Sequence, residues 1–109
     1  MSVAAMSVPV CAVADVPLGE GRAVTVEGRR IAVFNAPTGW YALDHACPHR
    51  GGPLADGIVS DSCVTCPLHE RRYDLATGVP VAGEGVPVAA HEVEVRDGRV
   101  LVSLAFEPA

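Results

Sequence analysis

The sequence predicts an all-β fold of roughly eight to ten short antiparallel strands, arranged as a sandwich or barrel. Half of the 109 residues are hydrophobic but only 5% are aromatic, and the 11 glycines and 9 prolines suit tight turns between short strands. No segment shows a sustained helical period of apolar residues. The length fits one domain, which we expect to span residues 1–109 with a loose tail over residues 1–7.

Charge and hydropathy exclude two classes of partner. The net charge is −5 and basic residues form no run, whereas binding to nucleic acid requires clustered Lys and Arg. No stretch approaches the roughly 20 apolar residues of a membrane helix, and residues 1–10 lack the positive region of a signal peptide. We therefore expect no nucleic acid, no membrane and a cytoplasmic location. In that reducing compartment, the four cysteines are predicted to be metal ligands or free thiols.

The N-terminal part of the chain is predicted to form one strand and then a hairpin. Residues 8–13 predict the first strand, and residues 14–21 a connection whose Gly-x-Gly is followed by no helical pattern. Two apolar runs, residues 22–26 and 30–34, flank a turn signal at residues 27–29. We therefore expect these two runs to pair as neighbouring strands.

The rest of the chain alternates short strands with turns. Strands are predicted at residues 40–43, 58–59, 63–65, 71–75, 91–95 and 99–104, and turns or loops at residues 36–39, 60–62, 76–78 and 82–87. The dipeptide Asp97-Gly98 is a strong signal for a two-residue hairpin turn between the last two strands. The hairpin that precedes Cys66 is expected to return this residue to the side of Cys47.

Two segments carry closely spaced metal-binding side chains. The first reads Cys47-Pro48-His49 and the second Cys66-Pro67-Leu68-His69, with sixteen residues between them. Two thiolates and two imidazoles suit either a tetrahedral zinc ion or a [2Fe–2S] cluster with mixed ligands. Alternate residues of an extended segment face the same side, so a Cys-x-His loop can deliver both groups to one cluster. This spacing favours the cluster over zinc, with one thiolate and one imidazole from each segment.

These residues and their neighbours resemble the two motifs of a Rieske [2Fe–2S] domain. Supporting matches are Gly51-Gly52-Pro53-Leu54, the hairpin at residues 58–65, and the run Tyr73-Asp74-Leu75-Ala76-Thr77-Gly78. The resemblance covers about residues 30–104. It implies a Rieske-type antiparallel β-sandwich or barrel, with a two-loop cluster-binding subdomain at about residues 45–81.

The resemblance also implies the roles of individual residues. The [2Fe–2S] cluster would be bound by Cys47, His49, Cys66 and His69, with the thiolates on the inner iron and the imidazoles on the outer iron. Tyr73, four residues after His69, matches a tyrosine that hydrogen-bonds the cysteine sulfur in high-potential Rieske proteins.

Within the Rieske family, the sequence is more similar to one class of small protein than to others. The ligand segments lack the extra cysteine that membrane-anchored quinol-oxidising subunits carry, and 109 residues leave no room for the catalytic domain of a terminal oxygenase. Residues 49–57 and 91–100 look most like the small subunit of assimilatory NAD(P)H-dependent nitrite reductase, which reduces nitrite to ammonia. We expect an electron-transfer subunit that catalyses nothing alone and whose partner is the large catalytic subunit or another redox protein.

Two alternatives to that assignment stay open. The first is a soluble Rieske ferredoxin of an aromatic-ring dioxygenase system, and the second is a zinc-stabilised binding module without a redox role. One departure from the family also stands out, because Glu70-Arg71 occupies a place where Rieske proteins usually have a small residue, most often Gly. A carboxylate beside the outer iron favours the oxidised state, so we expect a midpoint nearer about −150 mV than +300 mV.

Other cysteines and histidines have simpler interpretations. Cys63 and Cys66 form a Cys-x-x-Cys pair, but a thioredoxin-like site needs a helix N-terminus that the pattern does not predict. Cys63 is therefore expected to be a strand residue, and Cys11 a small core hydrophobe. His45 is not expected to be a ligand because the second segment has no counterpart at that offset. His91 is expected to be a surface or packed residue.

Overall fold

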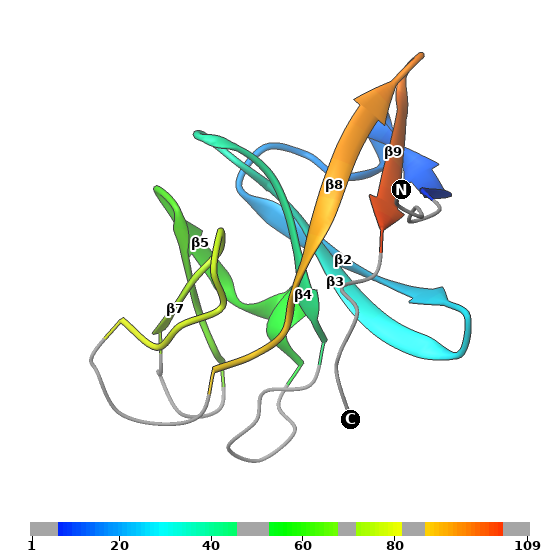
Figure 1. Cartoon of the computed structure of the whole chain (residues 1–109). Helices are drawn as coiled ribbons and strands as arrows, with labels where there is room; N and C mark the ends of the chain where they lie inside the picture. The colour runs from blue at the N-terminus through cyan, green and yellow to red at the C-terminus, as the bar shows by residue number, and fades with distance from the viewer. Residues whose placement is uncertain (1–6, 46–52, 68–71, 82–86, 104–109) are drawn as a thin grey trace.

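The computed structural model describes residues 7–45, 53–67, 72–81 and 87–103. These residues form two antiparallel sheets, one of six strands and one of three (Figure 1). The predicted all-β class is confirmed. Two single-turn 3-10 helices, η1 (Val13–Asp15) and η2 (Leu54–Asp56), were not predicted, because three residues are too few to show a helical period.

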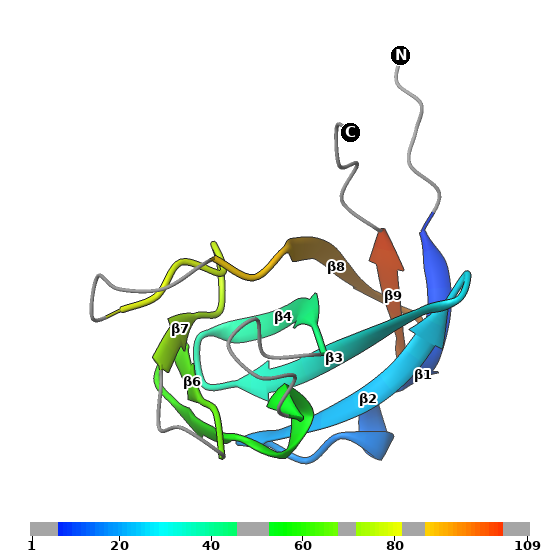
Figure 2. The same cartoon turned by 90° about the horizontal axis from the view of Figure 1, so that it is seen from below.

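The large sheet has the strand order β1-β9-β8-β4-β3-β2. Its strands are β1 (Val8–Ala12), β2 (Glu20–Val26), β3 (Arg29–Ala36), β4 (Gly39–Asp44), β8 (Ala90–Arg96) and β9 (Arg99–Ser103). The two edge strands, β1 and β2, contact each other, so the sheet curls almost into a closed barrel (Figure 2). This closure leaves little of either edge exposed to other chains.

The small sheet has the order β5-β6-β7 and lies beside one end of the large sheet (Figure 2). Its strands β5 (Ile58–Ser60), β6 (Cys63–Thr65) and β7 (Arg72–Asp74) contain three residues each. Strand β6 is central, pairing Val64 with Val59 on one side and with Tyr73 on the other. Sheets this small are not independently stable, so the large sheet must support it.

The hairpin turns are shorter than the sequence suggested. Val26 pairs with Arg29, so the first turn contains only Glu27 and Gly28, with φ angles of 50° and 85°. The Asp97-Gly98 turn has the same form, with φ angles of 54° and 77°, as predicted. Positive φ at both central residues matches the right-handed twist of the strands, which explains why two residues suffice. The predicted turn at residues 60–62 is likewise reduced to two residues, because Ser60 pairs with Cys63.

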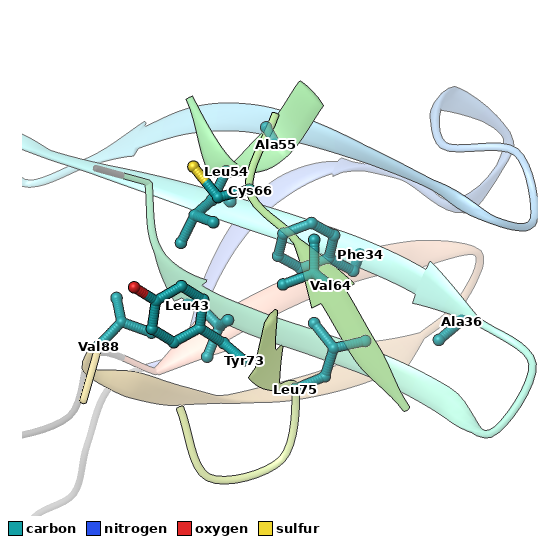
Figure 3. Packing of buried hydrophobic residues seen from close by; sticks show 11 residues of the cluster. Phe34, Ala36, Leu43, Leu54, Ala55, Val64, Cys66, Tyr73, Leu75 and Val88 are labelled. Carbon is teal, nitrogen blue, oxygen red and sulfur yellow. The ribbon is translucent and has the colours of Figure 1, made fainter. Parts of the chain in front are cut away.

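Two hydrophobic cores lie on opposite faces of β3. Ile31 and Val33 face one core while Ala32 and Phe34 face the other, because successive side chains of a strand alternate between faces. The barrel core, inside the curled sheet, contains Val26, Ile31, Val33, Ala42, Val100 and Val102. The inter-sheet core contains Ala32, Phe34, Ala36, Leu43, Leu54, Ala55, Val64, Cys66, Tyr73, Leu75 and Val88 (Figure 3). Burying a Leu or Phe side chain contributes about 1.5–3 kcal/mol, so the inter-sheet core can hold the small sheet in place.

Candidate metal centre

The structure describes one of the four predicted ligands. Cys66 lies directly after β6, while Cys47, His49 and His69 fall outside the described residues, together with Glu70 and Arg71. The hairpin of β5 and β6 that was predicted to lead to Cys66 is present. The described structure therefore includes the residues next to both ligand segments, and the complete ligand set stays a prediction.

Cys66 is fully buried at the end of the central strand of the small sheet. Its exposed fraction is 0%, and it packs in the inter-sheet core against residues of η2 and β7. Pro67, the next residue, is exposed, so the chain passes from the core to the surface within one residue. A buried thiol at the border between core and surface suits a ligand that faces inward, as the inner iron of a mixed-ligand cluster requires.

Tyr73 lies in the middle of β7, and only 1% of its surface is exposed. Figure 3 shows the Cys66 sulfur and the Tyr73 hydroxyl oxygen at the same end of the inter-sheet core, away from Ala36. Polar atoms at one end of an apolar core are suited to bind a group that lies there. This arrangement fits the predicted role of Tyr73 as a hydrogen-bond donor to sulfur, which stays a prediction.

Hydrogen bonds fix both ends of the first ligand segment. The His45 carbonyl accepts a hydrogen bond from the Leu54 N–H at 2.9 Å, which joins the residue before the segment to the residue at which η2 begins. The His45 N–H donates to the Arg30 carbonyl at 3.1 Å. A third hydrogen bond runs from the Ala55 N–H to His45 Nδ1 at 3.4 Å. The segment therefore leaves and re-enters the described structure at two points that are held together.

The His45 side chain is occupied by these neighbours. Burial and the nearby Arg30 guanidinium lower the pKa of His45, while the Asp56 carboxylate acts in the opposite direction. Both lowering effects favour the neutral imidazole, whose Nδ1 can accept the Ala55 hydrogen bond. The ring therefore supports the entry to the ligand segment from outside it.

A charged network that sequence reasoning missed lies next to this entry. Asp44, the last residue of β4, accepts a hydrogen bond from His91 Nε2 at 2.8 Å and from Arg29 Nη2 at 3.0 Å. The His91 side chain is 0% exposed, whereas about a third of Asp44 and of Arg29 is exposed. The sequence placed His91 among surface or packed residues and gave Asp44 no role. One sequence signal indicated that His91 faces inward: it alternates with Val93 and Val95, so the three side chains lie on the same face of the strand.

The remaining two cysteines occupy strands. Cys63 is half-buried in β6, as expected, and no helix begins at it, so the thioredoxin-like interpretation has no structural support. Cys11 is half-buried in β1 and packs at the border of the barrel core. Burial, and secondly the Asp15 carboxylate, raise the pKa of the Cys11 thiol, while Arg22 acts against them.

Among the residues that the structure describes, no helix is long and apolar enough to cross a membrane.

Comparison with known proteins gives a consistent family. A model of the Rieske-like [2Fe–2S] domain matches residues 7–103. The chain is 37% identical over 84 residues to the anthranilate 1,2-dioxygenase ferredoxin subunit of Burkholderia cepacia, which covers 75% of this chain and 78% of the relative. It is 30% identical over 95 residues to the ferredoxin component of the naphthalene 1,2-dioxygenase system of Pseudomonas aeruginosa, covering 84% and 88% of the two chains.

Solved structures with the same fold come from two kinds of system. A chain from the complex of reduced oxygenase and oxidised ferredoxin in carbazole 1,9a-dioxygenase has a TM-score of 0.83 and 30% identity, covering 95% of this chain and 100% of the other. A structure described as a nitrite reductase (NADPH) small subunit has a TM-score of 0.82 and 29% identity, covering 89% and 97%. A Mycobacterium tuberculosis structure described as an NADH-dependent nitrite reductase small subunit has a TM-score of 0.87, but its 23% identity supports the fold alone.

Proposed function

We propose that this chain, which belongs to the Rieske-like [2Fe–2S] domain family, is the electron-transfer small subunit of an assimilatory NAD(P)H-dependent nitrite reductase. Family membership means a Rieske-type [2Fe–2S] cluster as cofactor and transfer of one electron at a time as its task. The match over residues 7–103 is the observation that supports the electron-transfer function most directly, and it does not distinguish between classes of Rieske protein.

The cluster would be bound by Cys47, His49, Cys66 and His69. The described part of the chain fits this assignment, because Cys66 presents a buried thiol in the same core as Tyr73 and the entry to the other ligand segment is fixed at His45. When bound, the cluster accepts and releases a single electron. The protein would supply burial on the thiolate side and the Tyr73 hydroxyl group at the same end of the core, both of which would adjust the midpoint potential.

The nitrite reductase assignment is supported by sequence and by shape. Residues 49–57 and 91–100 look like the small-subunit pattern. The alignment with the structure described as a nitrite reductase (NADPH) small subunit covers 97% of that chain at 29% identity. The partner would be a large subunit that carries the nicotinamide, flavin, siroheme and [4Fe–4S] chemistry, and this chain would be its one-electron relay.

A second candidate is the ferredoxin component of an aromatic-ring dioxygenase system. Its support is the identity of 30–37% to two curated ferredoxins over most of both chains. In that function, the protein would shuttle electrons from a flavin reductase to an oxygenase. The same [2Fe–2S] centre serves both candidates, so the acceptor distinguishes them.

Two measurements test the proposal in order. Visible absorption and low-temperature EPR of the dithionite-reduced protein should show a Rieske cluster; a colourless protein with one bound zinc would instead support the zinc-stabilised module. The reduced protein should then be mixed with a purified siroheme-type large subunit plus nitrite, and separately with a terminal oxygenase plus aromatic substrate and oxygen. Rapid oxidation by the first acceptor alone supports the nitrite reductase assignment. Rapid oxidation by the second alone replaces it with the ferredoxin assignment.

A further inference from the structure

The network of Arg29, Asp44 and His91 joins three strands at the point where the chain enters the first ligand segment. Arg29 begins β3, Asp44 ends β4, and His91 lies near the start of β8. Asp44 Oδ1 lies 2.8 Å from His91 Nε2 and 3.0 Å from Arg29 Nη2, which also lies 3.3 Å from Oδ2. Two donors from different strands therefore converge on Oδ1, and the Arg29 donor also reaches Oδ2, which restricts the rotation of the carboxylate.

This network lies where the backbone ladder is weakest. Strands β4 and β8 share only two residue pairs, Ala42 with His91 and Leu43 with Ala90, followed by the hydrogen bond from the Asp44 N–H to the Ala89 carbonyl at 2.9 Å. The side-chain bond between Asp44 and His91 therefore supplies a further link across a short junction. The His91 side chain is fully buried while a third of the Asp44 side chain is exposed, so the bond is shielded from water on its His91 side.

The hydrogen bonds continue from Asp44 to both ends of the ligand segment. His45, the next residue, is bonded through its N–H to Arg30 and through its carbonyl to Leu54. Its ring accepts a further hydrogen bond from Ala55. A displacement of Asp44 would move His45, and with it the start of η2 on the other side of the segment. Each step in this path is a contact between described residues.

We propose that Asp44, held by His91 and Arg29, is a positioning residue. It fixes the two ends of the first ligand segment, at His45 and Leu54, and thereby stabilises iron binding by that segment. The proposal rests on the proposed function, because it takes Cys47 and His49 as ligands. None of the three residues in the network is expected to touch the iron. Their effect is exerted through the backbone of His45 and η2, as the outer partners of metal ligands generally act.

The test uses substitutions at His91 and Asp44 with a matched ion pair as control. His91→Leu removes the donor to Asp44, and Asp44→Asn removes the negative charge that strengthens both hydrogen bonds, whereas His91→Gln keeps a donor in place of Nε2. Glu94→Gln is the control. Glu94 lies on β8, as His91 does, and pairs with Arg96 at 2.6 Å, but the side chains of Glu94 and Arg96 are each about half exposed. Such an exposed pair contributes little to structure.

The first measurement is hydrogen exchange at the Leu54 and Ala55 amides, which needs no cluster. We expect His91→Leu and Asp44→Asn to accelerate exchange at these amides roughly tenfold or more, and His91→Gln to stay within about twofold of the parent protein. Glu94→Gln should leave exchange unchanged. Equal exchange in His91→Leu, Asp44→Asn and Glu94→Gln would overturn the proposal. If His91→Leu fails to fold, Asp44→Asn against His91→Gln makes the same comparison.

The second measurement is cluster retention in the holoprotein. The half-time of cluster loss to a chelator should fall on the order of tenfold in Asp44→Asn and His91→Leu, with an altered EPR spectrum, and stay at the parent value in Glu94→Gln. A merely structural role would lower thermal stability without altering the EPR spectrum, and that result would overturn the proposal. A parent protein that never acquires a cluster would refute the proposed function instead. The exchange measurement would still decide whether the network fixes the two ends of the first ligand segment.

Discussion

The two sheets of this molecule maintain their structure in different ways. In the large sheet, β2 and β3 share seven residue pairs, and the barrel core is built from aliphatic side chains of its own strands. In the small sheet, β5 and β6 share three pairs, and every large buried side chain belongs to the core shared with the other sheet. We therefore expect the large sheet to be a self-sufficient scaffold, and the small sheet to depend on that scaffold and on the cofactor.

This difference is consistent with the predicted ligand Cys66 lying in the less regular part of the molecule. A long, straight ladder offers few places where a side chain can leave the pleat and bind a metal. Short strands joined by proline-bearing loops can bring thiolates and imidazoles together, and the inter-sheet core then fixes the result. The comparison leads to predictions in which the two sheets respond differently to the same kind of change.

The largest effect is expected from removing the thiolate at the end of β6. Cys66→Ser should abolish the [2Fe–2S] absorption, because the hydroxyl of Ser is a poor ligand for iron in such a cluster. Amide exchange should then accelerate in β5, β6 and β7, while amides of β2 and β3 keep their protection. Cys63→Ser, three residues earlier and at the start of β6, is the control and should retain the cluster. A fully loaded Cys66→Ser protein would refute the assignment of this ligand.

A smaller but still large effect is expected from glycine substitutions in the two regions. Gly78 and Gly98 have almost the same φ angle, +78° and +77°, so an added Cβ costs about 1–2 kcal/mol at either position. At Gly98, in the hairpin of the large sheet, nothing lies within 4 Å of that Cβ. At Gly78, after the small sheet, it would lie 1.9 Å from the Val88 carbonyl oxygen.

Gly78→Ala should therefore lower the free energy of unfolding by more than Gly98→Ala does. Relief of the overlap must move Val88, whose N–H donates to the Gly78 carbonyl at 2.9 Å. Loss of this hydrogen bond would leave a buried polar group unsatisfied, which costs a further ~1–3 kcal/mol. Denaturant titration of both variants measures the difference directly. Equal losses of stability in the two variants would mean that the close contact between residues 78 and 88 does not contribute to the free energy of unfolding.

The third prediction concerns the Tyr73 hydroxyl group, which lies at the same end of the inter-sheet core as the Cys66 sulfur. Tyr73→Phe keeps the buried ring but removes the donor, so the reduced cluster, which is the more negative state, should lose more stabilisation than the oxidised one. The midpoint should fall on the order of tens of mV, since about 1.4 kcal/mol corresponds to 59 mV for one electron. Redox titration measures the shift, and Tyr41→Phe, whose hydroxyl bonds Thr38 instead, is the control. An unchanged or higher midpoint in Tyr73→Phe would remove the proposed donor role.

The sequence was informative wherever a local rule decides the structure. The hairpin turn at Asp97-Gly98 follows from a dipeptide that tolerates positive φ, and the hairpins at residues 27–29 and before Cys66 follow from the alternation of strand and turn residues. The strand bounds at these turns were wrong by a residue, because a two-residue turn and a three-residue turn have similar sequence signals. The ligand residues were predicted from their spacing, and that prediction stays untested because three of the four lie outside the described residues.

The sequence was uninformative wherever the outcome depends on which strands become neighbours. The pairing of Ala42 with His91 joins residues that are far apart in the chain, and no local pattern specifies it. The Asp44 and His91 side chains, 47 residues apart, meet only because β4 and β8 are adjacent. Long-range pairing of this kind is set by the fold as a whole, so the charged network could not be read from either segment alone.

The smallest effect is expected at the Cys11 thiol of the large sheet. Asp15 raises the pKa of Cys11, so Asp15→Asn should lower that pKa, increase the thiolate fraction at pH 8, and accelerate alkylation by iodoacetamide about twofold to fivefold. Arg22→Gln should slow alkylation, because the Arg22 charge acts in the opposite direction. Peptide mass spectrometry separates Cys11 from the other cysteines.

The same alkylation experiment compares the two sheets within one molecule. Alkylation of Cys11 should proceed at the same rate with and without the cluster, because β1 belongs to the self-sufficient sheet. Alkylation of Cys66 should appear only after iron is removed, because its sulfur is then no longer bound and the small sheet opens more often. If removing the cluster accelerated alkylation at Cys11 as much as at Cys66, the large sheet would depend on the cofactor too, and the two regions would unfold as one unit.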